Sequence, residues 1–303
     1  MKDTATKEIK EFLDYMQFVK KASPLTVKHY GPHLKEFFQL NNLHPQKVTK
    51  ADCIAYISRM AQEPMVKKRD GKEAVRMCRT IQNKCHTISS FFNYMVLMDK
   101  MDKNPFFKLP LPNDKSDRKK KVFMTEAECL AMLDLPQNTR QDRMDKLVLE
   151  FLYSSGGRRA DAWGSRLADL NLEAGTLHVV GKGRKPADLG INASCKRALE
   201  SYLATDRPVS DDPHLLLRED GKPYTGNIIY NTVARCAKKA GVNKKVSPHA
   251  WRRSLATHLK NRGVDLDTVR QLLRHESLSV TQQYLEENSA EVRSKVMTAH
   301  PRQ

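Results

Sequence analysis

The sequence predicts a mainly α-helical fold with a small β-sheet, divided into two domains. Apolar residues recur at intervals of three and four along most of the 303-residue chain, as on the buried face of a helix. Residues 175–191 instead alternate around a Gly-Lys-Gly turn, which is typical of a β-hairpin. Residues 113–121 are polar and charged without periodicity and indicate a linker. The length suits two domains of roughly 100 to 200 residues.

Residues 1–112 are expected to form an all-helical domain. The first predicted helix, in TKEIKEFLDYMQFVKKA, carries five apolar residues at helical spacing: Ile9, Phe12, Leu13, Met16 and Val19. A second helix begins with Ser23 as N-cap and Pro24 behind it. Residues 48–61 and 72–100 complete at least four helices. Their basic polar faces suit DNA binding, although solvated helices often carry such charges too.

Residues 122–303 combine helices with the hairpin. A helix in 143–157 runs into the pair Gly156-Gly157, and another begins after it. A further helix is expected from about Ser247 to Arg262, because Ser247 is a good N-cap, Pro248 fits the first helical position and Gly263 stands just past the end.

The net charge of +18 identifies nucleic acid as the leading partner. A membrane surface is the less favoured partner, because no run of about 18 apolar residues exists. The charged start MKDTATKEIKEFL resembles neither a signal peptide nor a membrane anchor. We therefore expect a cytoplasmic protein.

The six cysteines lack CxxC spacing and lack histidines at zinc-site spacing. Neither a disulfide framework nor a metal site is expected in a chain of this length. The cysteines are predicted to be reduced thiols, mostly buried.

Several side chains stand where they could face a phosphate. They are Arg158, Lys182, His249, Arg252, His275 and Tyr284. His249 and Arg252 share the first turn of their helix, where free N–H groups and the helix dipole favour an anion. Arginine binds phosphate oxygens in a bidentate manner, lysine or histidine can transfer a proton, and a tyrosine hydroxyl can be a nucleophile. With no carboxylate cluster apparent, these cations would act in place of a metal.

Taken singly, each of these residues also has an ordinary structural interpretation. Arg158 could form a salt bridge with Asp161, Lys182 could be a turn lysine, and Tyr284 could be a core aromatic packed with Leu285. The set as a whole favours phosphoryl transfer to tyrosine.

Four stretches resemble the motif blocks of the tyrosine recombinase, or phage integrase, family, in the right order and spacing. They are LYSSGGRRADAW, VVGKGRK, SPHAWRRSLATHL and LLRHESLSVTQQYL. SPLTVKHYGPHLKEFF and DKNPF resemble the family's core-binding domain, so the likeness covers nearly the full chain and is strongest to Xer-type members. It implies a helical, SAM-like core-binding domain in 1–112, a basic linker in 113–121, and an α+β catalytic domain in 122–303.

The resemblance also implies roles around the scissile phosphate. Arg158 and Arg252 would bind its non-bridging oxygens, and His275 would donate a hydrogen bond to it. No cofactor, metal or ATP would be needed.

The resemblance assigns the covalent and proton-transfer steps as well. Tyr284 would attack the phosphate and form a 3′-phosphotyrosyl link, and strand exchange would pass through a Holliday junction. Lys182 would protonate the leaving 5′-oxygen, with Lys185 a lesser candidate if the hairpin register differs. His249 would assist proton transfer.

Five residues depart from the family pattern without removing a catalytic group. Gly157 stands where the family usually has a bulky apolar residue, and Asp161 stands where glutamate is usual. Arg253 replaces a common histidine, and Arg274 replaces the usual glycine before His275. Arg159 adds a charge beside Arg158. The segment KPADLGI also lacks the usual hairpin ending. The added cations are candidate DNA contacts together with those of the linker: Arg118, Lys119, Lys120, Lys121, Arg159, Arg253 and Arg274.

The tail from residue 287 to 303 carries a small apolar face at Val292, Val296 and Met297. By the resemblance it would dock on a neighbouring protomer, in a homotetramer or a heterotetramer with a related recombinase on two DNA sites. The alternative is a tail folded back on its own domain. A topoisomerase-like enzyme and a non-catalytic DNA-binding protein of the same fold are the alternative functions.

Overall fold

The computed structural model describes residues 2–41, 43–62, 64–65, 74–75, 78–113, 122–181 and 186–274. The chain divides into two compact units, residues 1–119 and 120–303. The described fold is mainly helical with small antiparallel sheets, as predicted.

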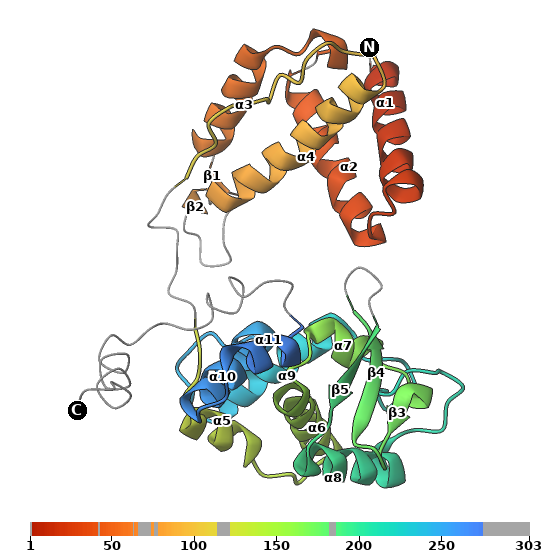
Figure 1. Ribbon diagram of the computed structural model, residues 1–303, viewed down its shortest axis with the longest axis vertical. Coiled ribbons are helices and arrows are strands. Elements are labelled where there is room, and N and C mark those ends of the chain that lie inside the picture. Colours follow the sequence, from red (N-terminus) through yellow and green to blue (C-terminus); the bar gives the residue numbers. More distant parts are fainter. Residues whose placement is uncertain are drawn as a thin grey trace, which may run out of the picture. The chain divides into compact units, whose positions relative to one another are not determined.

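The described part of the first unit contains helices and one short ribbon (Figure 1). In chain order the elements are α1 (Lys2–Asp14), a π-helical turn (Tyr15–Val19), α2 (Pro24–Asn41), a 3₁₀ turn (Pro45–Lys47), α3 (Lys50–Gln62), β1 (Pro64–Met65), β2 (Ala74–Val75) and α4 (Cys78–Leu97). As predicted, α2 follows Ser23, whose Oγ accepts a hydrogen bond from the Thr26 N–H at 3.1 Å.

The ribbon corrects the expectation of an all-helical domain. The periodicity placed Ala74 and Val75 in the long last helix, but they pair antiparallel with Pro64 and Met65. The helix begins only at Cys78. Pairing between segments about ten residues apart therefore outweighs the local helical pattern here.

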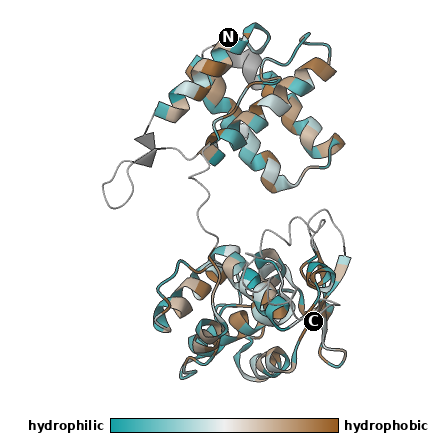
Figure 2. Cartoon of the chain, turned by 60° about the vertical axis from the view of Figure 1, so that its left-hand side comes forward, coloured by the Kyte–Doolittle hydropathy of each residue, from teal (hydrophilic) through white to brown (hydrophobic). Residues whose placement is uncertain are grey.

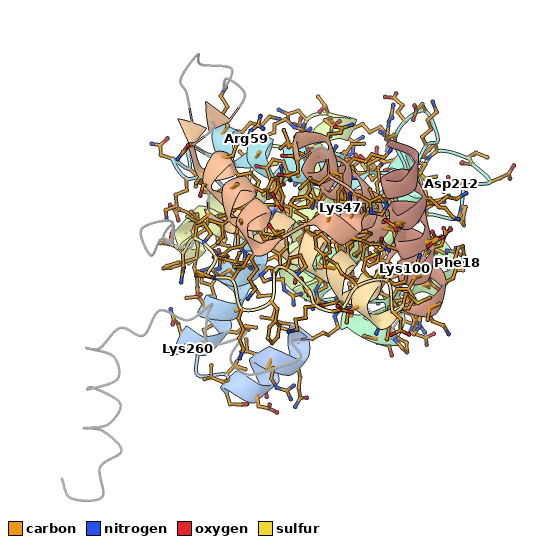
Figure 3. The ribbon with its side chains drawn as sticks, turned by 90° about the horizontal axis from the view of Figure 1, so that it is seen from above. Phe18, Lys47, Arg59, Lys100, Asp212 and Lys260 are labelled. Carbon is orange, nitrogen blue, oxygen red and sulfur yellow. The ribbon has the colours of Figure 1, made fainter. Side chains whose placement is uncertain are left out.

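The end of the first helix also differs from the simple pattern. Residues Tyr15–Val19 form a π-helical turn, in which the Lys20 N–H donates to the Tyr15 carbonyl at 2.9 Å. The wider turn rotates the following side chains off the apolar face. Val19, expected on that face, is 65% exposed, and Phe18, labelled in Figure 3, is 68% exposed.

An aromatic core holds the helices of this unit together. Phe12, Phe37, Phe91 and Phe92 are at most 1% exposed. Their rings meet edge to face, with centroids 5.5 Å apart for Phe12 and Phe91 and 6.1 Å apart for Phe37 and Phe92. This is the favoured geometry for aromatic pairs.

The DKNPF segment owes its pattern to Asn104. This buried side chain donates to the Ser89 carbonyl at 3.1 Å and to Asn93 Oδ1 at 2.7 Å, and it accepts from the Phe106 N–H at 2.8 Å. The segment is thereby fixed against α4.

The second unit combines helices with a three-stranded sheet. Its described elements are α5 (Glu126–Leu133), α6 (Arg140–Ser155), α7 (Arg159–Gly164), a 3₁₀ turn (Leu167–Asp169), β3 (Leu170–Asn171), β4 (Thr176–Val180), β5 (Pro186–Gly190), α8 (Ala193–Ser201), a π-helical turn (Tyr202–Asp206), α9 (Gly226–Lys239), α10 (Pro248–Asn261) and α11 (Leu266–Leu272).

Strands β4 and β5 form the predicted hairpin. The sheet order is β3-β4-β5, and all neighbours are antiparallel. Leu177 pairs with Leu189, and both side chains are buried. The residues between the strands, 182–185, lie outside the described part.

Helix α6 is the centre of this unit. It contacts α7, α8, α9, α10 and β5, and its buried residues include Leu147, Val148, Phe151 and Leu152. Figure 2 shows hydrophobic and hydrophilic stripes along the helices of each unit. The described elements at Arg158, His249 and Arg252, which are α7 and α10, therefore both pack on α6.

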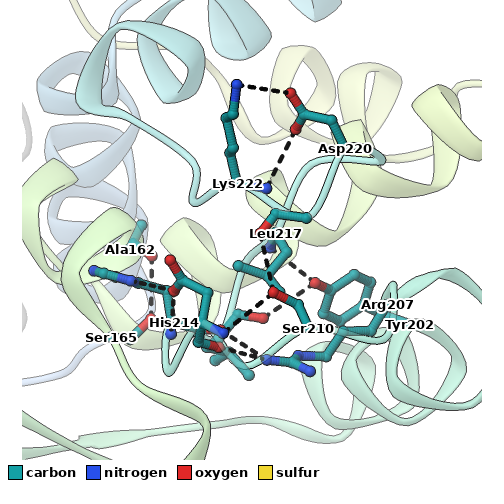
Figure 4. A network of polar contacts seen from close by, with 12 residues as sticks. Ala162, Ser165, Tyr202, Arg207, Ser210, His214, Leu217, Asp220 and Lys222 are labelled. Carbon is teal, nitrogen blue, oxygen red and sulfur yellow. Dashed lines mark hydrogen bonds and ion pairs between the residues drawn. The ribbon is translucent and has the colours of Figure 1, made fainter.

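A polar network anchors the chain that follows α7 (Figure 4). Tyr202 Oη donates to the Leu215 carbonyl at 3.1 Å and accepts from the Leu217 N–H at 2.9 Å. The Leu215 N–H donates to the Ser165 carbonyl at 2.8 Å. The far end of α7 is thus fixed, while its near end begins at the predicted site.

All six cysteines are free, and five of them are buried, as predicted. Burial raises the pKa of five thiols to about 12: Cys53, Cys85, Cys129, Cys195 and Cys236. Within the described ranges, no helix has the length and apolar character needed to cross a membrane.

Candidate active site

The glycine pair after α6 is required by close packing. Gly156 has φ +55°, and a Cβ there would lie 3.1 Å from the side chains of both Leu255 and Leu273. A Cβ on Gly157 would lie 2.9 Å from Ser155 Oγ, which accepts the Gly157 N–H at 3.0 Å. The serine hydroxyl therefore fills the space of a larger side chain at 157. This accounts for the small residue at that position.

Arg158 follows the pair as the N-cap residue of α7. Its backbone N–H donates to Asp161 Oδ2 at 2.7 Å, and its Nη2 donates to the carbonyl of Arg274 at 2.9 Å. The structural alternative of an Arg158–Asp161 salt bridge is not what is found. The guanidinium bound to the Asp161 carboxylate belongs to Arg274.

Helix α10 begins and ends where the sequence predicts. Ser247 is its N-cap and accepts the Ala250 N–H at 3.2 Å, Pro248 takes the first helical position, and Arg262 is the C-cap. Gly263 follows with φ +88°. His249 and Arg252 consequently share the first turn, at the positive end of the helix dipole.

Arg252 is deeply buried, with 2% of its surface exposed. Its guanidinium donates from Nη1 to the Gly156 carbonyl and from Nη2 to the Leu273 carbonyl. Leu273 and Arg274 are consecutive, so the carbonyls that receive Arg252 and Arg158 lie on adjacent residues. The fold thus brings Arg158 and Arg252 together just before His275.

His249 lies in the field of this cluster. The residue as a whole is exposed, yet the surrounding protein removes part of the hydration of its ring, and this desolvation is the largest cause that lowers its pKa. The positive charges of Arg252, Arg159, Arg253 and Arg158 lower the pKa further. A neutral imidazole is therefore favoured in the free protein, and an anion placed here would relieve the repulsion among these cations.

The three arginines singled out as extra cations have separate environments. Arg159 is exposed and lies against Gly226, where a Cβ would be 3.3 Å from Arg159 Nε. Arg253 Nη1 donates to the Val122 carbonyl at 2.8 Å, so this side chain holds the segment that follows the predicted linker. Arg274 is bound to Asp161.

Two further residues of α10 escaped the sequence reasoning. Ser254 Oγ accepts the Met124 N–H at 2.7 Å, and His258 Nε2 donates to the Met124 carbonyl at 2.9 Å. His258 Nδ1 accepts from Tyr153 Oη at 2.8 Å. The sequence does contain one indication of these two contacts. Ser254 and His258 are four residues apart in the predicted helix, which places both on one face.

The remaining predicted residues lie outside the described part of the chain. They are Arg118, Lys119, Lys120, Lys121, Lys182, Lys185, His275, Tyr284 and the tail 287–303. Among the residues that are described, no three histidine, cysteine or acidic side chains gather as a metal site.

Comparison with known proteins gives one consistent result. Residues 122–291 match the model of the phage integrase family. The chain is 30% identical to the tyrosine recombinase XerC of Oceanobacillus iheyensis over 305 aligned positions, which cover 97% of this chain and 96% of that protein.

Solved structures share the fold. A XerH site-specific recombinase bound to palindromic difH substrate has a TM-score of 0.70 at 18% identity, over 92% of this chain and 82% of that one. The Tn1549 transposon integrase in complex with circular intermediate DNA has a TM-score of 0.72 at 18% identity, over 95% and 98% of the two chains.

Proposed function

The chain belongs to the phage integrase family of tyrosine recombinases, and we propose that it cuts and rejoins double-stranded DNA through Tyr284. It is a site-specific DNA recombinase. The strongest support for this mechanism is the placement of two arginines. Arg158 and Arg252, from different helices, donate to the carbonyls of residues 274 and 273, directly before His275 in the chain.

Cleavage is a transfer of one phosphoryl group. The bond from Tyr284 Oη to phosphorus forms as the bond from phosphorus to the 5′-oxygen breaks. Arg158 and Arg252 hold the non-bridging oxygens and stabilise the charge that develops on them, and His275 adds a hydrogen bond. Removing one such preorganised donor typically costs an enzyme about 3 to 4 kcal/mol of transition-state stabilisation.

Proton transfer accompanies both bond changes. Lys182 gives a proton to the leaving 5′-oxygen, Lys185 being the lesser candidate for this role if the hairpin register differs. His249 accepts or relays the tyrosine proton. The lowered pKa of His249 supports this role, because a neutral imidazole can accept a proton at neutral pH. Rejoining is the reverse attack, by a 5′-hydroxyl on the phosphotyrosine. The phosphodiester energy is retained throughout.

We further propose the division of labour along the chain. The domain of residues 1–112 grips the duplex, with the basic linker 113–121 along its backbone, and the domain of residues 122–303 performs the chemistry. The net charge of +18 supports strong attraction to DNA phosphates. Four protomers, identical or shared with a related recombinase, assemble on two sites through the tail 287–303, in the cytoplasm.

Covalent capture tests this proposal. Wild-type protein and Tyr284→Phe are incubated with sheared DNA of the source replicon, denatured with detergent, and the DNA linked to protein is precipitated and sequenced. Enrichment of one sequence with wild type alone is expected, because only the tyrosine hydroxyl can form the phosphotyrosyl bond.

Covalent capture and a plasmid relaxation assay together separate the alternatives. Equal background from both proteins would contradict the covalent mechanism and favour a non-catalytic DNA-binding protein. Relaxation of supercoiled plasmids that lack paired sites would instead indicate topoisomerase-like activity.

A further inference from the structure

We propose that Arg274 is a positioning residue for DNA cleavage, which holds Arg158 and the turn before His275 through Asp161. This inference rests on the proposed function of Arg158 as a phosphate-binding residue. It assigns a role to a residue that the phosphoryl-transfer chemistry itself does not need.

The backbone of Arg274 is the first indication. Its φ is +49°, in the left-handed region that glycine adopts freely and that other residues adopt at a cost. The backbone conformation at residue 274 therefore does not favour arginine over glycine. The reason for an arginine here lies in the contacts of its side chain.

The side chain makes a shielded ion pair. Nη2 of Arg274 donates to Asp161 Oδ2, and the two side chains are 16% and 4% exposed. At such exposure the charges are weakly screened, so each strongly favours keeping its partner. Without Arg274, Asp161 would be a buried carboxylate that keeps the Arg158 N–H as a donor but no cation among its hydrogen-bond partners in the described ranges.

The contacts form a closed circuit of three residues. Asp161 accepts from the backbone N–H of Arg158 and from the guanidinium of Arg274. The guanidinium of Arg158 donates back to the Arg274 carbonyl. Arg158 is thus fixed at its backbone by Asp161 and at its side chain by Arg274. Loss of the Arg274 side chain would loosen the orientation of Arg158 without removing any group that touches the phosphate.

The neighbouring contact extends the circuit toward the second arginine. Arg252 donates to the carbonyl of Leu273, one residue earlier. The short turn at residues 273 and 274 therefore sets the spacing between the two guanidinium groups that would hold one phosphate. An error of about 1 Å in such a constellation can cost a factor of about 100 in rate.

The test compares Arg274→Gly, Arg274→Lys, Asp161→Asn and the double variant Arg274→Gly/Asp161→Asn. Glycine adopts the same backbone conformation without strain, so the substitution removes only the side chain. Lys21→Gly is a matched control, because Lys21 has φ +50°, is exposed and carries the same charge. Single-turnover cleavage is measured on a nicked suicide substrate made from the captured site, with protein in excess, beside DNA affinity and melting temperature.

We expect Arg274→Gly to cleave roughly ten to a hundred times more slowly, with DNA affinity and melting temperature close to wild type. Arg274→Lys should recover part of the rate, because it keeps a cation beside Asp161. The double variant should be no slower than the slower single variant, since both substitutions break one circuit. Lys21→Gly should cleave at the wild-type rate.

A second readout is independent of cleavage. The imidazole of His249 is titrated by NMR in the free protein, where Arg158 is one of the charges that lower its pKa. In Arg274→Gly, and not in Lys21→Gly, this pKa should move back toward its ordinary value as Arg158 leaves its place. An unchanged His249 pKa would overturn this inference, and the titration needs no covalent complex. Failure of the wild-type protein to form a covalent complex would separately refute the proposed function.

Other results would overturn the inference while the proposed function stands. These are wild-type cleavage by Arg274→Gly, a rate loss that follows a lowered melting temperature, and multiplicative effects in the double variant. A weaker affinity with a smaller salt dependence would show that Arg274 binds DNA directly.

Discussion

At His249, the local charge determines how DNA binding responds to pH. In the free protein its pKa is lowered by partial desolvation and by four arginines. A phosphate bound beside His249, as we propose, would bring negative charge to the same place and raise that pKa. Binding would then take up a proton whenever the pH lies between the two values.

The direction in which DNA affinity changes with pH follows from this proton uptake. DNA affinity of the Tyr284→Phe protein should rise as the pH falls from the pKa of the bound state toward the lower pKa of the free state. Affinity is measured at constant ionic strength across this window. His249→Gln should lose this component, and an identical pH dependence in both proteins would contradict the placement of the phosphate beside His249.

His258 shows the opposite use of a histidine, as a buried structural group. It is 5% exposed and donates to the Met124 carbonyl, so its neutral form is required for its contact with Tyr153. Burial is the largest cause that lowers its pKa. Its contribution to stability is therefore complete above the unfolded value near 6.5 and is lost as the pH falls through the folded value.

This gives a stability prediction. His258→Ala should lower the free energy of unfolding by about 3 kcal/mol at pH 8, because it leaves the partly buried Tyr153 hydroxyl and the buried Met124 carbonyl without this partner. Denaturant unfolding between pH 8 and pH 5 is the measurement. The wild type should lose more stability over this range than the variant, and parallel curves would count against the assignment.

At the scale of elements, the segment after the linker is bound to α10. Val122 and Met124 are held by Arg253, Ser254 and, through the same helix, His258. These contacts attach the entry of the second unit to the helix that carries His249 and Arg252. The position of α10 is thereby coupled to the point where the chain enters this unit.

Ser254 allows this attachment to be tested. Ser254→Ala leaves the Met124 N–H without its acceptor in a fully buried place, so unfolding should become easier by about 1 to 3 kcal/mol. Thr257→Ala is the control, since Thr257 Oγ1 donates to a carbonyl of its own helix, and it should cost less than about 1 kcal/mol. Equal losses in chemical denaturation would argue against a special role for Ser254.

At the scale of the whole molecule, assembly is the property to test. Removal of residues 287–303 should leave binding to a single half-site unchanged, while cooperative occupation of two half-sites falls to the level of independent binding. The physical reason is the loss of the apolar face at Val292, Val296 and Met297, which would bury surface on a neighbouring protomer. Gel-shift titrations on one and two half-sites measure both quantities, and retained cooperativity would exclude this role.

The sequence by itself determined the features that are local. The cap at Ser247, the start at Ser23 and the hairpin of residues 175–191 all follow from signals within a few residues, and the structure confirms each. The family and the recombinase function also followed from the sequence, because its motif blocks combine residue type with spacing. The roles of the six site residues, Arg158, Lys182, His249, Arg252, His275 and Tyr284, remain predictions.

The tertiary structure decided what local patterns do not contain. The helical pattern predicts Val19 on a buried face, whereas a π-helical turn leaves it exposed. A salt bridge between Arg158 and Asp161 was the ordinary structural alternative for Arg158, but the guanidinium that binds Asp161 belongs to Arg274, which lies 113 residues away in the chain. Packing around α6 brings these segments together. The choice of partner among like charges depends on that packing, because ion pairs form between the groups that the core places within a few ångströms.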